Sequence, residues 1–205
     1  MTRFSDLVHP SAGTALMSQW LTGTAERSRT AADTMLGEWA SAPAPPGRLA
    51  QHIFLATDGS GLLFYAQWSS DEAHLRWART HRPQLVSRVD ALVPGIERPG
   101  LTRTRLADSL VHDATRPAGL LVVSTAAHEG NDTAVLTAGM PLPGLLATYV
   151  HHTQDGEQTI RITEWDHARD YEAARTTGPG RQYTLYGGVV DEDGAAGLTL
   201  PLRQA

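Results

Sequence analysis

Four side chains that could carry chemistry alternate along the segment from residue 158 to residue 165. Thr159, Arg161, Thr163 and Trp165 are spaced two residues apart. Successive residues of a strand point to opposite faces, so these four would share one face. That face is too polar for a closed core, because burying an arginine without partners is strongly unfavourable. The pattern predicts a cavity that holds a ligand, water or acids, unless the strand simply faces solvent.

Two histidines and a tyrosine flank this segment. His151 and His152 precede it, and imidazole titrates near neutral pH, as a catalytic base requires. Adjacent strand residues face opposite sides, so only one of the two can enter the cavity. A two-residue turn at Asp155-Gly156 would put His152 on the Trp165 face, whereas a bulge would put His151 there. A helix after the strand would bring Tyr171 over the same face.

The composition excludes several kinds of catalysis. Cysteine is absent from the 205 residues, and all 17 basic residues are arginine. This rules out thiolate nucleophiles, cysteine metal sites, lysine Schiff bases and phosphate-loop lysines. The histidine spacing fits no metal-binding motif, and no glycine-rich segment fits a flavin or nucleotide fingerprint. We therefore expect neither a metal nor a cofactor.

Charge and hydropathy limit the partners. The net charge is −5, and no basic cluster is interleaved with aromatic residues, so a nucleic-acid partner is not expected. No apolar run approaches the length of a membrane span, and the N-terminus lacks the apolar stretch of a signal peptide. We expect a cytoplasmic protein without a membrane partner.

The chain carries an internal repeat. A shift of 97 residues superimposes Pro46-Gly47 on Pro143-Gly144, Asp58-Gly59 on Asp155-Gly156, and Trp68 on Trp165. An ungapped match of this density indicates a duplication. We expect two units, at residues 1–113 and 119–205.

Each half shows the same order of expected elements. In the first half, hydrophobic periodicity and turn signals predict strands at 14–20, 49–57, 62–68 and 101–111. Helices are predicted at 24–40 and from residue 70, the second one broken at Pro83. In the second half, strands are predicted at 120–126, 145–154, 158–165 and 183–190, and helices at 131–138 and 167–175. The ends 1–10 and 198–202 are expected to be an arm and an edge strand or oligomer contact.

This order is that of the ferredoxin-like βαββαβ unit, so the predicted class is α+β. Helices on one face of each sheet leave the other face apolar and uncovered. Two units in tandem can bury these faces against each other, which predicts an intramolecular dimeric α+β barrel. Whether two such chains associate further into a homodimer stays open.

A short motif resembles a known family. The segment FYAQWSSDEA at residues 64–73, preceded by ATDG at 56–59, resembles the antibiotic biosynthesis monooxygenase family and its anthrone oxygenases of aromatic polyketide pathways. The family tryptophan that ends the third strand matches Trp68 and Trp165. A family tyrosine six residues later corresponds to His74 and is kept as Tyr171.

Other family positions are retained unevenly. A family arginine corresponds to Arg88 in the first half, and a family histidine corresponds to His151 in the second. A family asparagine is replaced by Phe64 and by Arg161. The face of the first half that carries Phe64 is apolar throughout, which indicates packed core. We therefore expect the second half to hold the active cavity.

The resemblance implies a cofactor-independent monooxygenase. Its substrates would be molecular oxygen and a small aromatic, anthrone-like polyketide that it oxidises to a quinone. In this hypothesis His151 or His152 is the base, Arg161 and Tyr171 stabilise phenolate oxygens, and Trp165 stacks on the rings. Further residues would bind the substrate: Thr159, Thr163, Trp68, His74 and Arg88. Two alternatives stay open: a non-oxidative polyketide cyclase or isomerase, and a non-catalytic barrel that binds aromatic ligands.

Overall fold

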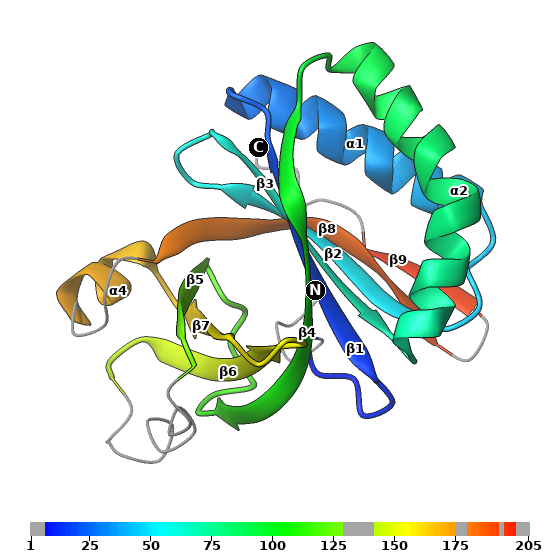
Figure 1. Cartoon of the computed structure of the whole chain (residues 1–205). Helices are drawn as coiled ribbons and strands as arrows, with labels where there is room; N and C mark the ends of the chain where they lie inside the picture. The colour runs from blue at the N-terminus through cyan, green and yellow to red at the C-terminus, as the bar shows by residue number, and fades with distance from the viewer. Residues whose placement is uncertain (1–6, 129–141, 175–179, 193–194, 200–205) are drawn as a thin grey trace.

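The fold is α+β, built on one antiparallel sheet (Figure 1). The computed structural model describes residues 7–128, 142–174, 180–192 and 195–199. Nine strands follow one another in the order β2-β3-β1-β4-β6-β7-β5-β8-β9, and β2 also pairs with β8. The first eight strands therefore form a closed ring. No helix among the described residues is long and apolar enough to span a membrane.

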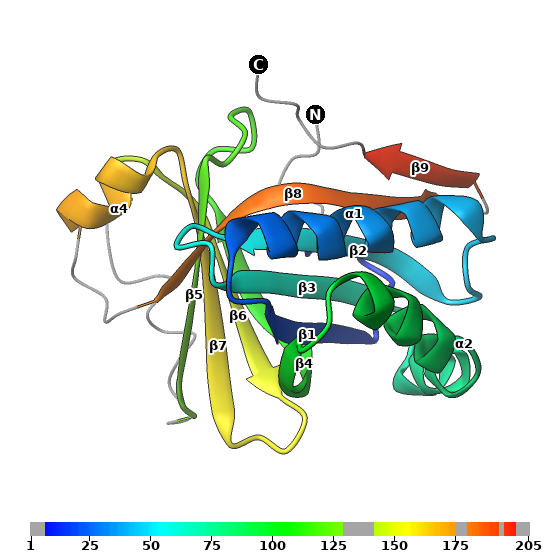
Figure 2. The ribbon, with the colours of Figure 1, turned by 90° about the horizontal axis from the view of Figure 1, so that it is seen from above.

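The N-terminal half supplies four strands and the two long helices. Its elements are β1 (Thr14–Leu21), α1 (Ala25–Ser41), β2 (Arg48–Ala56), β3 (Gly61–Trp68), α2 (Asp71–Leu92) and β4 (Glu97–Val111). The Thr24 hydroxyl caps α1 by accepting a hydrogen bond from the backbone N–H of Arg27, and the Ser70 hydroxyl caps α2 by accepting one from Ala73. Both helices lie over one face of β1, β2 and β3 (Figure 2).

The C-terminal half has a similar order of strands but less described helix. Its elements are β5 (Leu120–Ala127), β6 (Leu145–Thr153), β7 (Gln158–Trp165), α4 (Ala168–Ala174), β8 (Arg181–Glu192) and β9 (Ala195–Thr199). The expected helix at 131–138 lies outside the described residues. Strand β9 pairs with β8, so the expected extra edge strand is present over 195–199. Residues 200–202 are not described.

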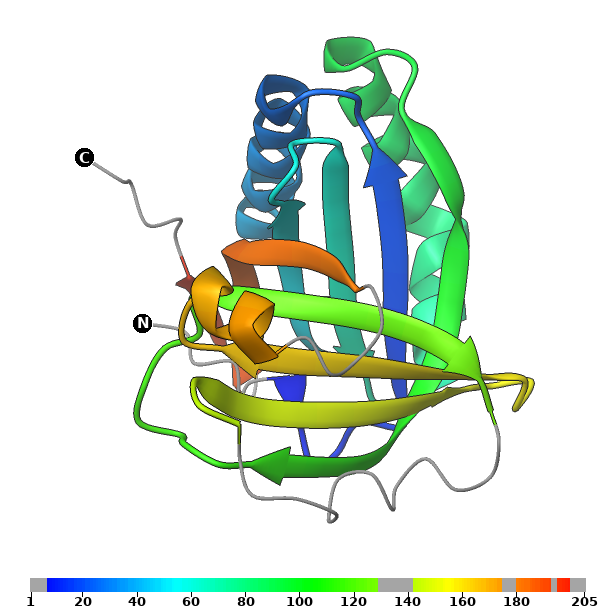
Figure 3. The same ribbon diagram turned by 90° about the vertical axis from the view of Figure 1, so that its left-hand side faces the viewer.

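The two halves close the ring through matching strands. Within the sheet the N-terminal half has the order β2-β3-β1-β4, and the C-terminal half has β6-β7-β5-β8. The last strand of each half pairs with the second strand of the other, β4 with β6 and β8 with β2. As a result β5, β6 and β7 cross β1, β2 and β3 steeply (Figure 3).

The ring interior is filled by side chains from both halves. Met17, Phe54 and Tyr65 of the N-terminal half pack with Tyr149 and Ile162 of the C-terminal half, and further members of the cluster come from other strands. Leu7 also belongs to this cluster, so the expected N-terminal arm is anchored at that residue. Burial of this shared apolar surface is the main force holding the halves together.

Helix α2 runs continuously through Pro83, so the predicted break is wrong. Proline removes one backbone donor and crowds the preceding turn, which usually kinks a helix rather than ending it when packing holds both sides. Here His74 lies buried before the proline, and Leu85 and Val89 lie buried after it. The packing of these two segments therefore stabilises the helix by more than the exposed proline destabilises it.

A buried ion pair joins the two halves. The Arg48 Nε lies 2.6 Å from Asp191 Oδ2, and Arg48 Nη2 lies 3.1 Å from Asp191 Oδ1. The side chains are only 3% and 6% exposed. Removing one partner of such a pair leaves the other charge buried without compensation.

We expect Asp191→Ala to lower the free energy of unfolding by about 3–5 kcal/mol, because Arg48 stays buried without its partner. Denaturant unfolding followed by circular dichroism measures this. The matched control is Arg169→Ala, which breaks the exposed Arg169–Asp170 pair and should cost less than about 1 kcal/mol. Equal losses in the two variants would contradict the role given to the buried pair.

Two interior histidines predict acid sensitivity. Burial lowers the pKa of His52 to about 4; burial, helped by neighbouring His152, lowers that of His151 to about 3. In the unfolded chain these histidines bind protons near the ordinary histidine pKa, whereas in the folded chain they stay neutral at that pH. Stability should therefore fall as the pH drops below about 6.5, with each histidine contributing at most about 1.4 kcal/mol per pH unit.

Denaturant unfolding at several pH values between about 7 and about 5 tests this dependence. His151→Phe should flatten the pH profile, because it removes one of the buried histidines whose pKa lies below the ordinary value. His167→Gln is the control, since that side chain is 53% exposed. An unchanged slope in His151→Phe would overturn the interpretation.

Candidate functional site

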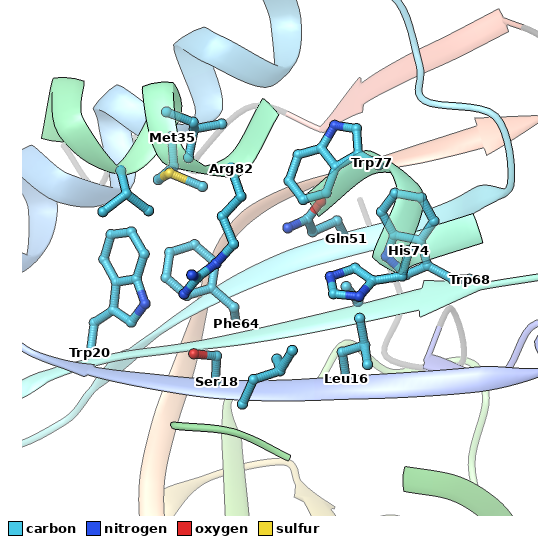
Figure 4. Close-up of a pocket in the computed structure, with 14 residues that line it drawn as sticks. Leu16, Ser18, Trp20, Met35, Gln51, Phe64, Trp68, His74, Trp77 and Arg82 are labelled. Atoms are coloured by element: carbon cyan, nitrogen blue, oxygen red, sulfur yellow. The ribbon is translucent and has the colours of Figure 1, made fainter. Parts of the chain in front are cut away.

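A small cavity lies between the sheet and the two long helices of the N-terminal half (Figure 4). Its volume is about 70 Å³. Leu16, Ser18 and Trp20 of β1 form its floor together with Phe64 and other residues of β3, and α1 and α2 cover it. Along β1 and β3 the residues that form this floor alternate with residues that point into the ring interior. One strand therefore lines both the ring core and the cavity.

Aromatic rings form both ends of the cavity. Trp68 lies with its ring centroid 5.2 Å from His74 and 5.6 Å from Trp77. At the other end, the rings of Trp20 and Phe64 meet edge to face at 4.7 Å. Such rings suit a flat aromatic ligand, because they offer both faces for stacking and edges for T-shaped contacts.

His74 enters this cavity as a neutral hydrogen-bond donor. Arg103 Nη2 lies 3.0 Å from His74 Nδ1, and arginine can only donate, so Nδ1 accepts and the ring proton is on Nε2. Burial, reinforced by the charges of Arg103 and Arg82, lowers the pKa of His74 to about 4, although Asp71 opposes the shift. At neutral pH the ring therefore offers an N–H and not a free basic nitrogen.

The position of His74 depends on the other half of the chain. Arg103 on β4 also binds Asp71 Oδ1 at 2.9 Å, and Asp71 Oδ2 accepts from Gln154 Nε2 at 3.2 Å. Gln154 follows β6, the strand that pairs with β4. Ring closure thus holds the network that orients the histidine.

Arg82 adds a positive charge at the cavity. Its side chain extends from α2 toward the space between Trp20 and Phe64 (Figure 4). Among the described residues it has no hydrogen-bond or ion-pair partner. None of the 14 lining residues is acidic, so the charge of Arg82 is available to an anionic ligand.

Two polar atoms in the cavity wall are buried without a partner among the described residues. They are Trp68 Nε1 and Gln51 Oε1. A buried polar atom without a hydrogen bond costs about 1–3 kcal/mol. A ligand that brings both a carbonyl and a hydroxyl group to this wall could satisfy one donor and one acceptor.

A larger groove adjoins the cavity. Its volume is about 620 Å³, and it lies between the end of α1, the segment 42–46 and α2. Trp77 and Leu85 line both spaces. Arg88 lines the groove, with its Nη2 2.6 Å from Glu38 Oε2 on α1.

The polar residues of β7 share one face, as their alternation predicts. On the neighbouring strand, His152 pairs with Thr159 across β6 and β7, so His152 and not His151 lies on this face. Its Nδ1 is 3.2 Å from Thr159 Oγ1, and its ring centroid is 4.2 Å from that of His128. Arg161 is half-buried, and its Nε has no partner among the described residues.

Trp165 and Tyr171 meet at one end of the same face, under α4. Their ring centroids are 5.6 Å apart, and both pack with Leu120 and Val122. Trp165 Nε1 donates to Thr163 Oγ1 at 2.9 Å. None of the residues predicted on this face lines either of the two cavities described above.

His151 points into the ring interior. It is fully buried, and its Nε2 lies 3.1 Å from the Tyr65 hydroxyl, which itself donates to the Leu7 carbonyl at 3.0 Å. This histidine lines neither cavity. Of the residues predicted from the sequence, the N-terminal cavity brings together Trp68 and His74, and the adjoining groove includes Arg88.

Several cavity residues were not predicted from the sequence. Trp77 and Arg82 lie on the cavity side of α2, and Trp77 is three residues after His74, a spacing that shares a helix face and could have identified it. Arg103 and Gln51 carry no such signal, because their contact with the site arises only from strand pairing. Within the described ranges, no cluster of three or more acidic, histidine or cysteine side chains is arranged to hold a metal ion.

Proteins of known structure share this fold. An anthrone oxidase-like protein superimposes with a TM-score of 0.67 at 18% identity, covering 85% of this chain and 92% of its own. A candidate monooxygenase from Fusobacterium nucleatum subsp. nucleatum gives 0.53 at 10% identity, covering 95% and 99%. Chlorite dismutase from Candidatus Nitrospira defluvii, in complex with imidazole, gives 0.54 at 12%, covering 88% and 93%.

Comparison at the sequence level finds no such relatives. No protein-family model matches the chain, and no curated protein matches it. At these identities the structural likeness shows the fold alone. The residues of the cavity, and not the fold, determine the chemistry.

The protonation of His74 can be tested directly. We expect nitrogen-detected NMR of the imidazole to show an Nε2–H tautomer that stays neutral down to about pH 4. Arg103→Met should raise the pKa of His74 toward its ordinary value, because it removes a nearby positive charge. Arg116→Met, far from the ring, is the control. A proton on Nδ1 at neutral pH would contradict the arrangement.

Proposed function

We propose that the protein is a cofactor-independent monooxygenase that oxidises an anthrone-like aromatic polyketide to a quinone. The observation that carries this proposal is the composition of the N-terminal cavity. Aromatic rings line it, its polar groups include N–H donors beside the Gln51 carbonyl oxygen, and no carboxylate lines it. Such a site favours a flat aromatic anion, the electron-rich form that reacts with oxygen. The fold that the chain shares with an anthrone oxidase-like protein also supports an oxygenase function.

The reaction needs no group beyond the substrate and oxygen. Loss of a proton from the methylene carbon gives a delocalised enolate, which passes one electron to O2. Recombination of the resulting radicals forms a carbon–oxygen bond as a peroxide. Loss of water then leaves the carbonyl, so that the methylene and O2 become the quinone carbonyl and water. The protein has to stabilise the anion and keep its surroundings dry.

The side chains divide this task. The Nε2–H of His74, the indole N–H of Trp68 and the Arg82 guanidinium would donate to the enolate and phenolate oxygens. Stacking on Trp77 and Trp68 would orient the rings. Because His74 is neutral with Nδ1 occupied, we assign it as a donor and not as the base. The proton would pass to water at the cavity mouth, helped by the positive charge that lowers the substrate pKa.

Binding requires the cavity to open. A volume of about 70 Å³ is too small for a three-ring substrate. Arg82 is exposed and Trp77 is half-buried, so these two side chains of α2 are the ones that we expect to move. Their displacement would connect the cavity to the adjoining groove.

A non-catalytic aromatic-ligand-binding barrel is the second candidate. The observation that favours it is that, among the residues lining the cavity, neither a carboxylate nor a free imidazole nitrogen is available as a base. The same rings and donors would then only hold an aromatic ligand. Oxygen consumption separates the two functions.

We also propose that the chain arose by duplication of a ferredoxin-like unit, with units at residues 1–113 and 119–205. The matching strand orders of the two halves support this, as does the sequence repeat around the two Asp-Gly turns. In this proposal the N-terminal unit keeps a cavity under its helices.

Oxygen uptake with a hydroxylated anthrone tests the proposed function. Metal-stripped, cofactor-free protein should consume oxygen in step with quinone absorbance, above the rate of a boiled control. We expect Arg82→Ala to lower kcat/KM by about 10- to 100-fold, and Trp68→Phe to lower it by a similar factor through loss of one donor. Thermal unfolding of each variant separates lost activity from lost folding.

The corresponding variant of the C-terminal half decides which half is active. Trp165→Phe changes the matching tryptophan of β7 and should reduce the rate less than Trp68→Phe. A larger loss in Trp165→Phe would move the reaction to the C-terminal face. Tight binding of the anthrone with no oxygen uptake would favour the binding barrel.

A further inference from the structure

We propose that the outer sheet face of the C-terminal half binds a phosphate group. The residues that would hold it are Arg161 and Thr163 of β7 and Ser124 of β5. Figure 3 shows this face, with α4 over one end of β7. None of the three residues lines the N-terminal cavity, so the phosphate site does not depend on the proposed oxygenase function.

Arg161 carries a charge that no described residue compensates. It is half-buried, yet its guanidinium has neither a hydrogen-bond nor an ion-pair partner in the described part of the chain, although residues 119–205 include eleven acidic side chains. We expect an arginine that only stabilises the fold to be paired, because withdrawing a charge from water without compensation is unfavourable. Its Nε is buried while the two Nη atoms remain open to solvent, so a dissolved anion can reach the charge.

Thr163 offers an oriented hydroxyl donor on the same face. Trp165 Nε1 lies 2.9 Å from its Oγ1. An indole nitrogen can only donate, so the hydroxyl accepts this bond and directs its own hydrogen elsewhere. That hydrogen meets no acceptor within the described ranges. Because Thr163 is two residues after Arg161 on one strand, the two side chains project from the same face toward one ligand.

Ser124 adds a donor from the neighbouring strand. It stands directly opposite Arg161 in the pairing of β5 with β7. Side chains opposed in this way have Cβ atoms about 4.5–5.5 Å apart, which lets one ion contact both. Ser124 is half-buried, and its hydroxyl forms no hydrogen bond to any residue that the structure describes.

The three strands place no acidic side chain on this face. The sequences of β5 and β6 contain no aspartate or glutamate. The only acid of β7 is Glu164, which alternates to the ring interior, where the Tyr149 hydroxyl lies 3.3 Å from its Oε2. Arg161 therefore makes this face of the three strands positive, which favours an anion there.

The number and placement of the donors favour a phosphate over a carboxylate. Two Nη atoms and two hydroxyls project from neighbouring strands. A carboxylate presents two oxygens in one plane, whereas a phosphate group presents three strong acceptor oxygens and a charge of about −1.5 to −2. Three oxygens can meet the guanidinium fork and both hydroxyls at once. A free phosphate ion and a phosphate carried by a larger molecule share this chemistry.

Binding of three anions to the full chain tests the proposal. The probes are inorganic phosphate, phenyl phosphate and benzoate, followed by NMR of the arginine Nε–H signals and by calorimetry. We expect phenyl phosphate to bind with a dissociation constant below about 1 mM, more weakly as salt is raised, and more tightly than benzoate. If the phenyl group adds no affinity over inorganic phosphate, the ligand is the free ion; if it does, the ligand is a phosphorylated molecule.

Matched variants locate the binding. Arg161→Met should lower the phosphate affinity about tenfold or more, and Arg161→Lys should restore part of it, because lysine keeps the charge without the fork. Arg169→Met, which removes a side chain that is 79% exposed, controls for net charge. Ser124→Ala should weaken binding about three- to tenfold. Thr125→Ala changes the next residue of β5, which faces the other way, and should leave the affinity unchanged.

Three results would each overturn the proposal. They are a lack of phosphate binding at millimolar concentration, binding that survives Arg161→Met, and benzoate binding as tightly as phenyl phosphate. We expect Arg161→Met to stay folded, because it removes an unpaired, half-buried charge, and thermal unfolding checks this.

One further variant separates the two halves. Arg82→Ala changes the N-terminal cavity and should leave the phosphate affinity unchanged. If Arg82→Ala abolishes phosphate binding while Arg161→Met does not, the anion sits in the N-terminal cavity and the proposed C-terminal site is overturned. The oxygenase function would still stand on the measured oxidation of the anthrone.

Discussion

Closure of the strand ring is the constraint on which the rest of the structure depends. Each half exposes one apolar sheet face, and neither half can bury that face alone. Pairing of β2 with β8 and of β4 with β6 turns the two faces into one interior. The same closure leaves the outer sheet face of the N-terminal half to α1 and α2, where the cavity forms. It also fixes the buried Arg48–Asp191 pair at the seam.

Closure of the ring also fixes the polar network beside the cavity. Asp71 on α2 and Arg103 on β4 orient His74, and Gln154 from the opposite half holds Asp71 in place. His74, on a helix, is thus positioned by a strand whose partner comes from the other half. His74 is consequently held in one orientation beside the cavity.

The sequence predicted the framework more completely than the site. The third strand of the C-terminal half lies at residues 158–165, as its alternation indicated, and register placed His152 on the predicted face. Alternation shows which side chains share a face but not what covers that face. The apolar face of β3 therefore looked like closed core, although the structure has a small cavity over this face, lined by Phe64, Trp20 and Trp68. Arg103 and Gln51 join the site through pairing that no local pattern records, and Pro83 is tolerated because tertiary packing outweighs local preference.

The short connection between the halves has a thermodynamic consequence. β4 ends at Val111 and β5 begins at Leu120, and Arg116 holds this segment by contacts to Asp113 and Asp166. A ring assembled from two separate chains would dissociate on dilution, because its association is bimolecular. Here the two halves meet at the effective concentration set by a tether of a few residues. The closed ring, and with it the His74 network, should therefore persist at protein concentrations where a two-chain counterpart falls apart.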